Sequence, residues 1–142
     1  MSKIQKLLQK ARNAPHKIHF HELERILDQA NKYTVKISNS TNTPFIEDSY
    51  NASFGSGILI DKTNGIIITN AHVSSYSPSI NRVNFKYSDP IQSKQIYIDP
   101  EIDLAFLQLD PKSIPKEAIE AKLQCKNDYK QGQNVVAFGH PN

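Results

Sequence analysis

The sequence G-S-G-I-L-I-D-K-T-N-G-I-I-I-T-N-A-H-V, residues 55–73, places two short apolar runs on either side of a turn and ends beside a histidine. β-Branched residues favour strands, and Asn-Gly favours a tight hairpin because both residues tolerate a positive φ. We therefore expect strands over 55–61 and 66–69, with His72 directly after the second. A histidine in that position is either a base in a catalytic site or a polar residue that closes a buried strand.

Short β runs of the same kind continue on both sides of the hairpin. We expect further strands at residues 33–38, 82–87, 94–98, 104–109 and 134–139. Short strands separated by turns are typical of a barrel or a sandwich. Earlier in the chain, apolar residues recur at helical spacing over 2–13 and over about 20–31. The sequence thus predicts a mainly β fold with N-terminal helices.

Composition narrows the class of protein. The chain has 142 residues, of which 38 % are apolar, enough for one domain with a modest core. A net charge of +3 is mildly basic but lacks the dense basic face of a nucleic-acid binder, so we expect no nucleic-acid partner. No apolar run has the length of a membrane span or a secretory signal. We therefore expect no membrane contact and a cytoplasmic location, with an organellar transit peptide as the alternative.

The single cysteine and the N-terminal histidines give weaker evidence of a functional site than His72 does. The single cysteine, Cys125, excludes an internal disulfide, and without a nearby histidine it is expected to be buried or incidental rather than catalytic. The spacing of His16, His19 and His21 does not match a helical zinc site, and no ligand set accompanies them. We expect surface histidines, and no metal or cofactor.

A catalytic role for His72 requires a carboxylate on one ring nitrogen and a hydroxyl on the other. Asp103 opens an apolar strand in D-P-E-I-D-L-A-F-L, and a carboxylate at the edge of a core must find a partner there. His72 and Asp103 are therefore a candidate pair. Asp99 and Asp110 flank the same segment and are interpreted as solvated residues at strand ends.

Three segments, taken in order, resemble one family. Residues 55–73 resemble the strand, hairpin and T-N-x-H-V segment of trypsin-like serine proteases of the HtrA/Deg branch. D-P-E-I-D-L-A-F-L-Q-L is similar to the segment that carries the acid of the triad. G-Q-N-V-V-A-F-G-H-P-N is similar to the G-x-x-V-x-A-I-G-N-P segment that opens the second barrel. A helix followed by a strand also matches the lead-in of the family, so the resemblance covers residues 22–142.

This resemblance implies two antiparallel six-stranded barrels with the active site in the cleft between them. The strands between residues 33 and 109 would complete the first barrel, and 134–139 would begin the second. It assigns His72 as general base and Asp103 as the acid that orients it, with polypeptide substrates and no cofactor. We divide the chain into an N-terminal helical extension, 1–31, and a truncated protease domain, 32–142.

The family order of the triad is histidine, aspartate, serine. Its serine lies in a G-N/D-S-G-G turn that would fall beyond Asn142, together with the oxyanion hole and the specificity pocket. We therefore expect the chain as given to be inactive. Ser56 lacks the strand-to-helix context of a nucleophile, and the serines that follow His72 too closely are interpreted as loop residues, namely Ser74, Ser75 and Ser77. His140 stands where the family often has Asn or Ser and is also interpreted as a loop residue.

Other hypotheses remain open at this stage. A first barrel without its partner would expose apolar surface, which predicts low stability or self-association of the isolated chain. A degenerate protease half, or a truncated pseudo-protease, that serves as a non-enzymatic protein-binding module is the main alternative. The N-terminal residues are also faintly similar to small HicA-type RNA-cleaving toxins, but I-S-N-S-T-N lacks the histidine of that family.

Overall fold

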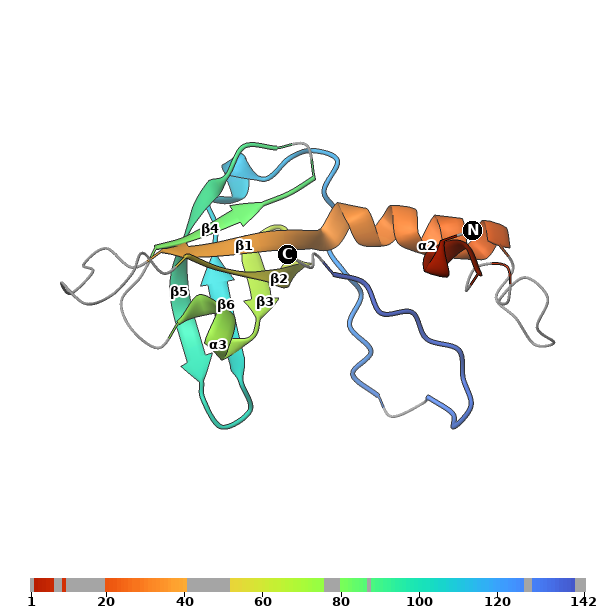
Figure 1. Cartoon of the computed structure of the whole chain (residues 1–142). Coiled ribbons are helices and arrows are strands. Elements are labelled where there is room, and N and C mark those ends of the chain that lie inside the picture. The colour runs from red at the N-terminus through yellow and green to blue at the C-terminus, as the bar shows by residue number, and fades with distance from the viewer. Residues whose placement is uncertain are drawn as a thin grey trace.

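Six antiparallel strands close into a barrel in the part of the chain that the computed structural model describes, residues 2–6, 9, 20–40, 52–75, 80–86, 88–126 and 129–139 (Figure 1). Around the barrel the strands follow the order β1-β2-β3-β6-β5-β4. Their bounds are β1 (Thr34–Ser40), β2 (Ala52–Asp61), β3 (Ile66–Thr69), β4 (Ile80–Asn84), β5 (Ile91–Asp99) and β6 (Leu104–Gln108). The mainly β, trypsin-like barrel predicted from the sequence is confirmed.

Helices flank the barrel. The helix α2 (Phe20–Tyr33) leads directly into β1 and projects away from the barrel (Figure 1), and the second predicted helix is thereby confirmed. Of the first predicted helix, residues 3–6 and 9 are helical, and its other positions lie outside the described residues. A one-turn helix, α3 (Ala71–Ser74), follows β3, and a 3₁₀ turn, η1 (Pro111–Ser113), follows β6. None of the helices in the described ranges is long and apolar enough to cross a membrane.

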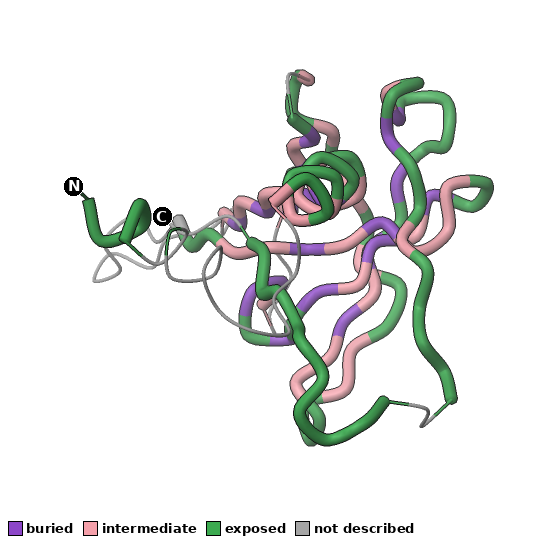
Figure 2. Tube along the Cα trace, turned by 90° about the vertical axis from the view of Figure 1, so that its right-hand side faces the viewer, coloured by how far each residue is buried: buried purple, intermediate pink, exposed green. Residues whose placement is uncertain are grey.

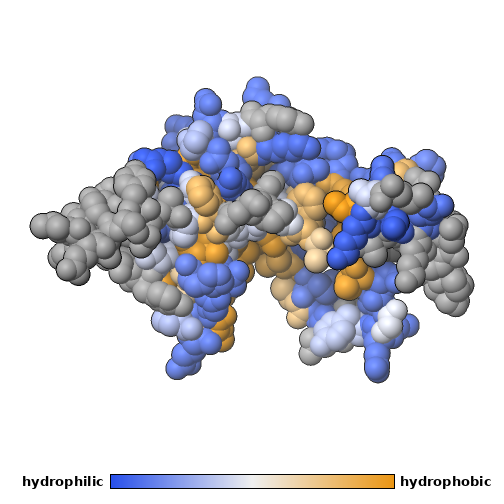
Figure 3. All heavy atoms as spheres, in the orientation of Figure 1, coloured by the Kyte–Doolittle hydropathy of each residue, from blue (hydrophilic) through white to orange (hydrophobic). Residues whose placement is uncertain are grey.

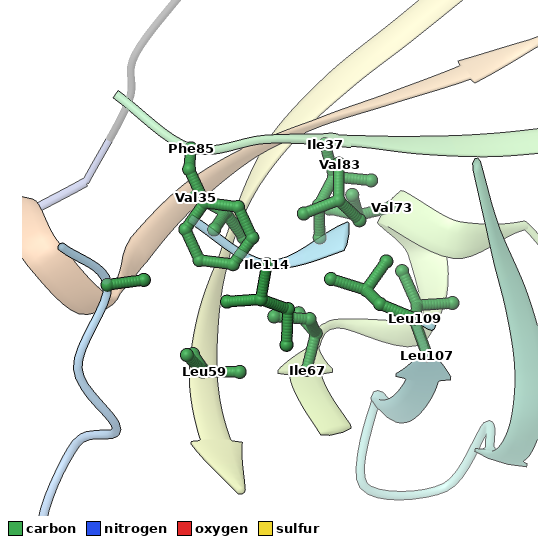
Figure 4. Packing of buried hydrophobic residues seen from close by; sticks show 11 residues of the cluster. Val35, Ile37, Leu59, Ile67, Val73, Val83, Phe85, Leu107, Leu109 and Ile114 are labelled. Atoms are coloured by element: carbon green, nitrogen blue, oxygen red, sulfur yellow. The ribbon is translucent and has the colours of Figure 1, made fainter. Parts of the chain in front are cut away.

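Alternation of buried and exposed side chains explains the strands. In β3, Ile67 and Thr69 face the interior while their neighbours lie half-exposed, as expected for a strand with one face in a barrel. The inward-facing residues form one apolar cluster: Val35, Ile37, Leu59, Ile67, Val73, Val83, Phe85, Leu107, Leu109, Ile114 and Ala118 (Figure 4). Complete burial of each large apolar side chain contributes about 1.5–3 kcal/mol. Figure 2 shows buried positions gathered in the barrel and exposed ones along the C-terminal segment.

The turn between β2 and β3 differs from the predicted tight hairpin. Residues 62–65 form the connection, and Gly65 has a positive φ of 71° whereas Asn64 does not. The Asp61 carboxylate accepts hydrogen bonds from the backbone N–H of Asn64 at 3.0 Å and from its side-chain amide at 2.8 Å. The register shifts between Leu59 and Asp61. The strands are confirmed, but four residues connect them, and the Asp61 side chain closes this turn through Asn64.

The seventh predicted strand is not formed. Residues 134–139 have no strand assignment and are exposed, although their apolar pattern suits a strand. A strand requires a neighbour that supplies ladder hydrogen bonds, and in the described ranges the barrel strands pair with one another.

Figure 3 shows apolar residues near the middle of the molecule, bordered by hydrophilic ones. The division of the chain at residue 31 stays a prediction.

Candidate active site

His72 is the second residue of α3, the helix that begins directly after β3. The hydroxyl of Thr69, the last residue of β3, donates to the carbonyl of Ser56 in β2 at 2.8 Å, which fixes the end of the strand. Asn70 precedes the helix with extended backbone, φ −81° and ψ 146°, and its side chain makes no capping hydrogen bond to α3. The chain therefore turns sharply after a firmly held strand end and presents His72 there.

Asp103 occupies the turn that enters β6. Its φ of 55° lies in the left-handed region, which Asp tolerates better than most residues. The Asn70 side-chain amide donates to the Asp103 carbonyl at 3.1 Å and so holds this turn against the start of α3. The turn brings the carboxylate to the helix that carries His72.

The Asp103 carboxylate contacts His72 at two atoms. Oδ1 accepts a hydrogen bond from the His72 backbone N–H at 2.9 Å, and Oδ2 lies 2.6 Å from Nδ1 of the ring. The backbone N–H groups in the first turn of a helix have no partner within the helix, and the Asn70 side chain does not cap them. The first contact satisfies one of these groups, that of His72. The two predicted site residues are thus brought together, with Asp103 fixing both the backbone and the ring of His72.

Electrostatics determine which ring nitrogen carries the proton. The backbone N–H of His72 lowers the pKa of Asp103 below 3.8; desolvation opposes this, and the ring of His72 lowers the pKa further by hydrogen bonding and by charge. Asp103 is therefore ionised at neutral pH and can only accept, so the proton lies on Nδ1 of His72. In the neutral ring Nε2 then carries a lone pair, on a side chain that is 64 % exposed. A ring in this state can act as a base toward an external hydroxyl.

Packing behind α3 sets the position of the site. Val73 is buried and belongs to the apolar cluster (Figure 4). It lies against Gly55 of β2. A Cβ atom on Gly55 would lie 2.5 Å from Cγ2 of Val73. The glycine before Ser56 is therefore needed for the close approach of β2 to the helix that carries His72. In the family that the sequence resembles, the G-S-G element is a packing and turn element of the first barrel, and the contact of Gly55 with Val73 agrees with that role.

The remaining serine and aspartate candidates have structural roles. Ser56 pairs with Lys36 across β1 and β2, and its position is that of a strand residue. Ser74 is fully buried in α3, whereas Ser77 lies outside the described residues. Asp99 and Asp110 both cap turns: the first accepts from Glu101 N at 3.0 Å and the second from Lys112 N at 3.0 Å. They were predicted as solvated strand ends, and the structure adds these backbone hydrogen bonds.

Cys125 and the other histidines do not belong to the His72–Asp103 pair. Cys125 is exposed, so the expectation that it is buried is wrong and the incidental alternative remains. Of the N-terminal histidines, His21 is exposed in α2, and the other two lie outside the described residues, as does His140. Among the residues that the structure describes, no group of three or more histidine, cysteine, aspartate or glutamate side chains is arranged to hold a metal ion.

An antiparallel barrel that presents a carboxylate-bound histidine is the arrangement of a serine-protease fold. Comparison with known families agrees, because the model of the trypsin-like peptidase domain matches residues 55–142. The chain belongs to the trypsin-like peptidase family.

Individual relatives point to one branch of this family. The chain is 34 % identical over 109 residues to the pro-apoptotic serine protease NMA111 of Saccharomyces cerevisiae, covering 77 % of this chain and 11 % of the relative. It is 38 % identical over 89 residues to a probable periplasmic serine endoprotease DegP-like of Pseudomonas fluorescens, covering 63 % of this chain and 17 % of the relative. The chain therefore spans between about a tenth and a sixth of the length of these relatives.

Proposed function

We propose that His72 and Asp103 are the general base and the orienting carboxylate of a serine endopeptidase of the HtrA/Deg type, whose nucleophilic serine is supplied from outside residues 1–142. The double contact between Asp103 and His72 carries this proposal. Membership of the trypsin-like peptidase family and the serine-protease names of the relatives support it. Polypeptides are the proposed substrates.

In this mechanism Nε2 of His72 removes the proton of the serine hydroxyl as its oxygen attacks the scissile carbonyl. The imidazolium that forms is stabilised by ionised Asp103 through Nδ1–H, and Nε2 then passes the proton to the leaving amine. Water then gives up a proton to Nε2 and attacks the acyl carbon; the bond from that carbon to the serine oxygen breaks, Nε2 returns the proton to the serine oxygen, and the carboxylic acid is released. Correctly positioned general-base catalysis contributes about 10²–10⁴-fold to the rate.

The described residues supply the base without a group for it to activate. The hydrogen bonds of His72 go to Asp103, and in the described ranges no serine hydroxyl is hydrogen-bonded to its ring. Ser74 is the last residue of α3, two residues after His72. Its hydroxyl donates to Ala71 O and to Gln95 Oε1, both at 3.4 Å. We therefore propose that residues 1–142 by themselves do not hydrolyse peptide bonds.

The first experiment treats residues 1–142 with a serine-directed fluorophosphonate probe and with casein. We expect no labelled serine and no hydrolysis, and stoichiometric labelling of a serine would overturn the assignment. The second experiment expresses the coding sequence continued past codon 142, as wild type, His72→Ala and His21→Ala. Hydrolysis should be lost in the first variant and kept in the second, because His21 is an exposed residue of α2. Equal rates in all three proteins would rule out His72 as the base.

A second candidate function is a non-enzymatic protein-binding module. The observation that favours it is the exposure of large apolar side chains on the segment 129–139, where Tyr129 is 72 % and Val135 is 86 % exposed. Such surface promotes contact with other chains. The coding DNA separates the two candidates: an in-frame G-x-S-G-G after codon 142 supports the peptidase, whereas a genuine stop codon supports the module.

A further inference from the structure

The helix that carries His72 cannot hold its own shape. α3 has four residues, and a single helical turn is too short to be stable without outside contacts. The next residue, Ser75, has φ 75° and ψ 144°, a backbone conformation that non-glycine residues rarely adopt and that persists only where the surroundings hold it. Contacts from elsewhere in the fold must therefore fix the C-terminal end of α3.

Two buried asparagine side chains supply those contacts. Nδ2 of Asn39 donates to the carbonyl oxygen of Ser74, the last residue of α3, at 2.9 Å. Nδ2 of Asn81 donates to the same oxygen at 3.1 Å. The three residues are 4 %, 2 % and 0 % exposed respectively. The carbonyl at the end of the helix is thus held by two amide donors that water does not reach.

The two asparagines also hold each other. They are cross-strand neighbours on β1 and β4. Because a carbonyl only accepts, both side-chain amides must direct their nitrogen toward the Ser74 oxygen. The second hydrogen on Asn39 Nδ2 is donated to Asn81 Oδ1 at 2.9 Å. The hydroxyl of Ser93 donates to the backbone carbonyl of Asn81 at 2.8 Å and ties β5 to the same point. A buried polar group is costly unless it is hydrogen-bonded, so this cluster is fixed in one arrangement.

His72 lies between two anchors of α3. On one side the Asp103 carboxylate holds its backbone N–H, and on the other the asparagines hold the carbonyl of Ser74 two residues later. If the second anchor were released, Ser75 could relax and the helix turn could unwind. His72 would then lose its alignment with the carboxylate.

We propose that Asn39 and Asn81 are positioning residues that act through the Ser74 carbonyl to keep His72 aligned with Asp103. The pair would hold the ring in the protonation state that a general base needs, and this catalytic consequence rests on the proposed function. The alternative is that the asparagines only stabilise the barrel.

The test compares Asn39→Leu and Asn81→Leu with Val83→Ala in the 142-residue chain labelled with ¹⁵N and ¹³C. Val83 is a fully buried apolar residue of β4, so its truncation lowers stability without removing a hydrogen bond to Ser74. The first readout is the low-field proton signal of the His72 Nδ1–H bound to Asp103. The second is the ¹³C titration of the Asp103 carboxylate, whose pKa is lowered mainly by the His72 backbone N–H.

We expect the asparagine variants to lose the low-field signal and the pKa of Asp103 to rise toward 3.8 in them, whereas Val83→Ala keeps both wild-type values. Unchanged readouts in the asparagine variants would overturn the proposal, and so would equal losses in Val83→Ala. If Asn39→Leu does not fold, Asn81→Leu decides: it keeps the Asn39 donor but removes the second donor to Ser74 and the acceptor that orients Asn39, so both readouts must still differ from the wild type. These readouts need no serine, so their outcome is independent of the hydrolysis experiment.

Discussion

One carboxylate, that of Asp103, fixes both the backbone and the ring of His72, with Oδ1 2.9 Å from the backbone N and Oδ2 2.6 Å from Nδ1. The two contacts couple the orientation of the ring to the position of α3. Neither can change without breaking a hydrogen bond to an ionised group, and such charge-assisted bonds are stronger than neutral ones. The carboxylate in turn is placed by the left-handed turn before β6 and by the Asn70 amide.

Replacing Asp103 by asparagine should reverse the protonation of the His72 ring. The amide nitrogen would donate to Nδ1 and move the ring proton to Nε2, leaving no free lone pair toward substrate. Long-range ¹H–¹⁵N NMR spectra at neutral pH should show this change of tautomer in the 142-residue chain. In a protein that contains the serine, we expect kcat to fall by about 10⁴-fold. Asp99→Asn, at a turn-capping residue, is the control, and an unprotonated Nε2 in Asp103→Asn would contradict the prediction.

Acid should weaken the fold through the same carboxylate. Because the folded-state pKa of Asp103 is lowered from 3.8, this group contributes stability that is fully present above pH 3.8. That contribution is lost as the pH falls through the lowered value, since the folded carboxylate then takes up its proton. Chemical unfolding measured from pH 7 to pH 2 should show the decline below pH 3.8.

The Asp103→Asn variant should lack this part of the decline. The Asp61 carboxylate, whose pKa is lowered mainly by the Asn64 side chain, produces a second loss in the same direction. Asp61→Asn therefore serves as a matched variant at the turn between β2 and β3, where the carboxylate bonds to Asn64 rather than to His72. If the Asp103→Asn protein showed the full wild-type decline, the carboxylate would not be coupled to folding as described.

Local patterns predicted the barrel strands and the candidate pair. The run 66–69 consists of β-branched residues and forms β3, and His72 and Asp103 each flank an apolar run, so both were expected at strand ends near the core. The strand bounds moved by up to three residues at the ends, as β5 shows by starting at Ile91. Patterns of this kind depend on neighbours in the sequence, which is why they could be predicted.

Contacts between distant residues outside the His72–Asp103 pair were not predictable. Asn39 lies 35 residues from Ser74 and 42 from Asn81, and nothing in the local sequence indicates that three polar groups meet inside the barrel. Asparagine often caps the start of a helix, but the Asn70 side chain donates to the Asp103 carbonyl instead. The failed strand at 134–139 has the same origin, because apolar residues suit a strand whereas pairing needs a partner.

Adding a methyl group at Gly55 should disturb the helix that carries His72. The new Cβ would lie 2.5 Å from Cγ2 and 2.6 Å from Cγ1 of Val73, a buried and stiff side chain. Overpacking of this kind costs about 1–3 kcal/mol, so Gly55→Ala should lower the free energy of unfolding by that amount. Urea denaturation at neutral pH measures it.

Removing the two Val73 methyl groups should relieve the strain at Gly55. The double variant Gly55→Ala/Val73→Ala should be less destabilised than the sum of the single variants, which is the coupling expected of residues in contact. Gly57→Ala is the matched control, because its Cβ would meet Ile37 and Ile67 instead, and Val73→Ala should not rescue it. Additive effects at Gly55 and Val73 would show that the two residues do not limit each other.

The exposed apolar segment 129–139 should cause the isolated chain to self-associate. Val135 is 86 % exposed, so Val135→Asp removes apolar surface without disturbing the core and should leave the thermal unfolding temperature unchanged. We expect light scattering to show a lower average mass for this variant than for the wild type at equal concentration. Gln133→Asp adds the same charge two residues away on the same segment and should leave the mass near the wild-type value. A wild type that is a monodisperse monomer would contradict the prediction, and an equal decrease in both variants would assign the effect to charge rather than to apolar contact.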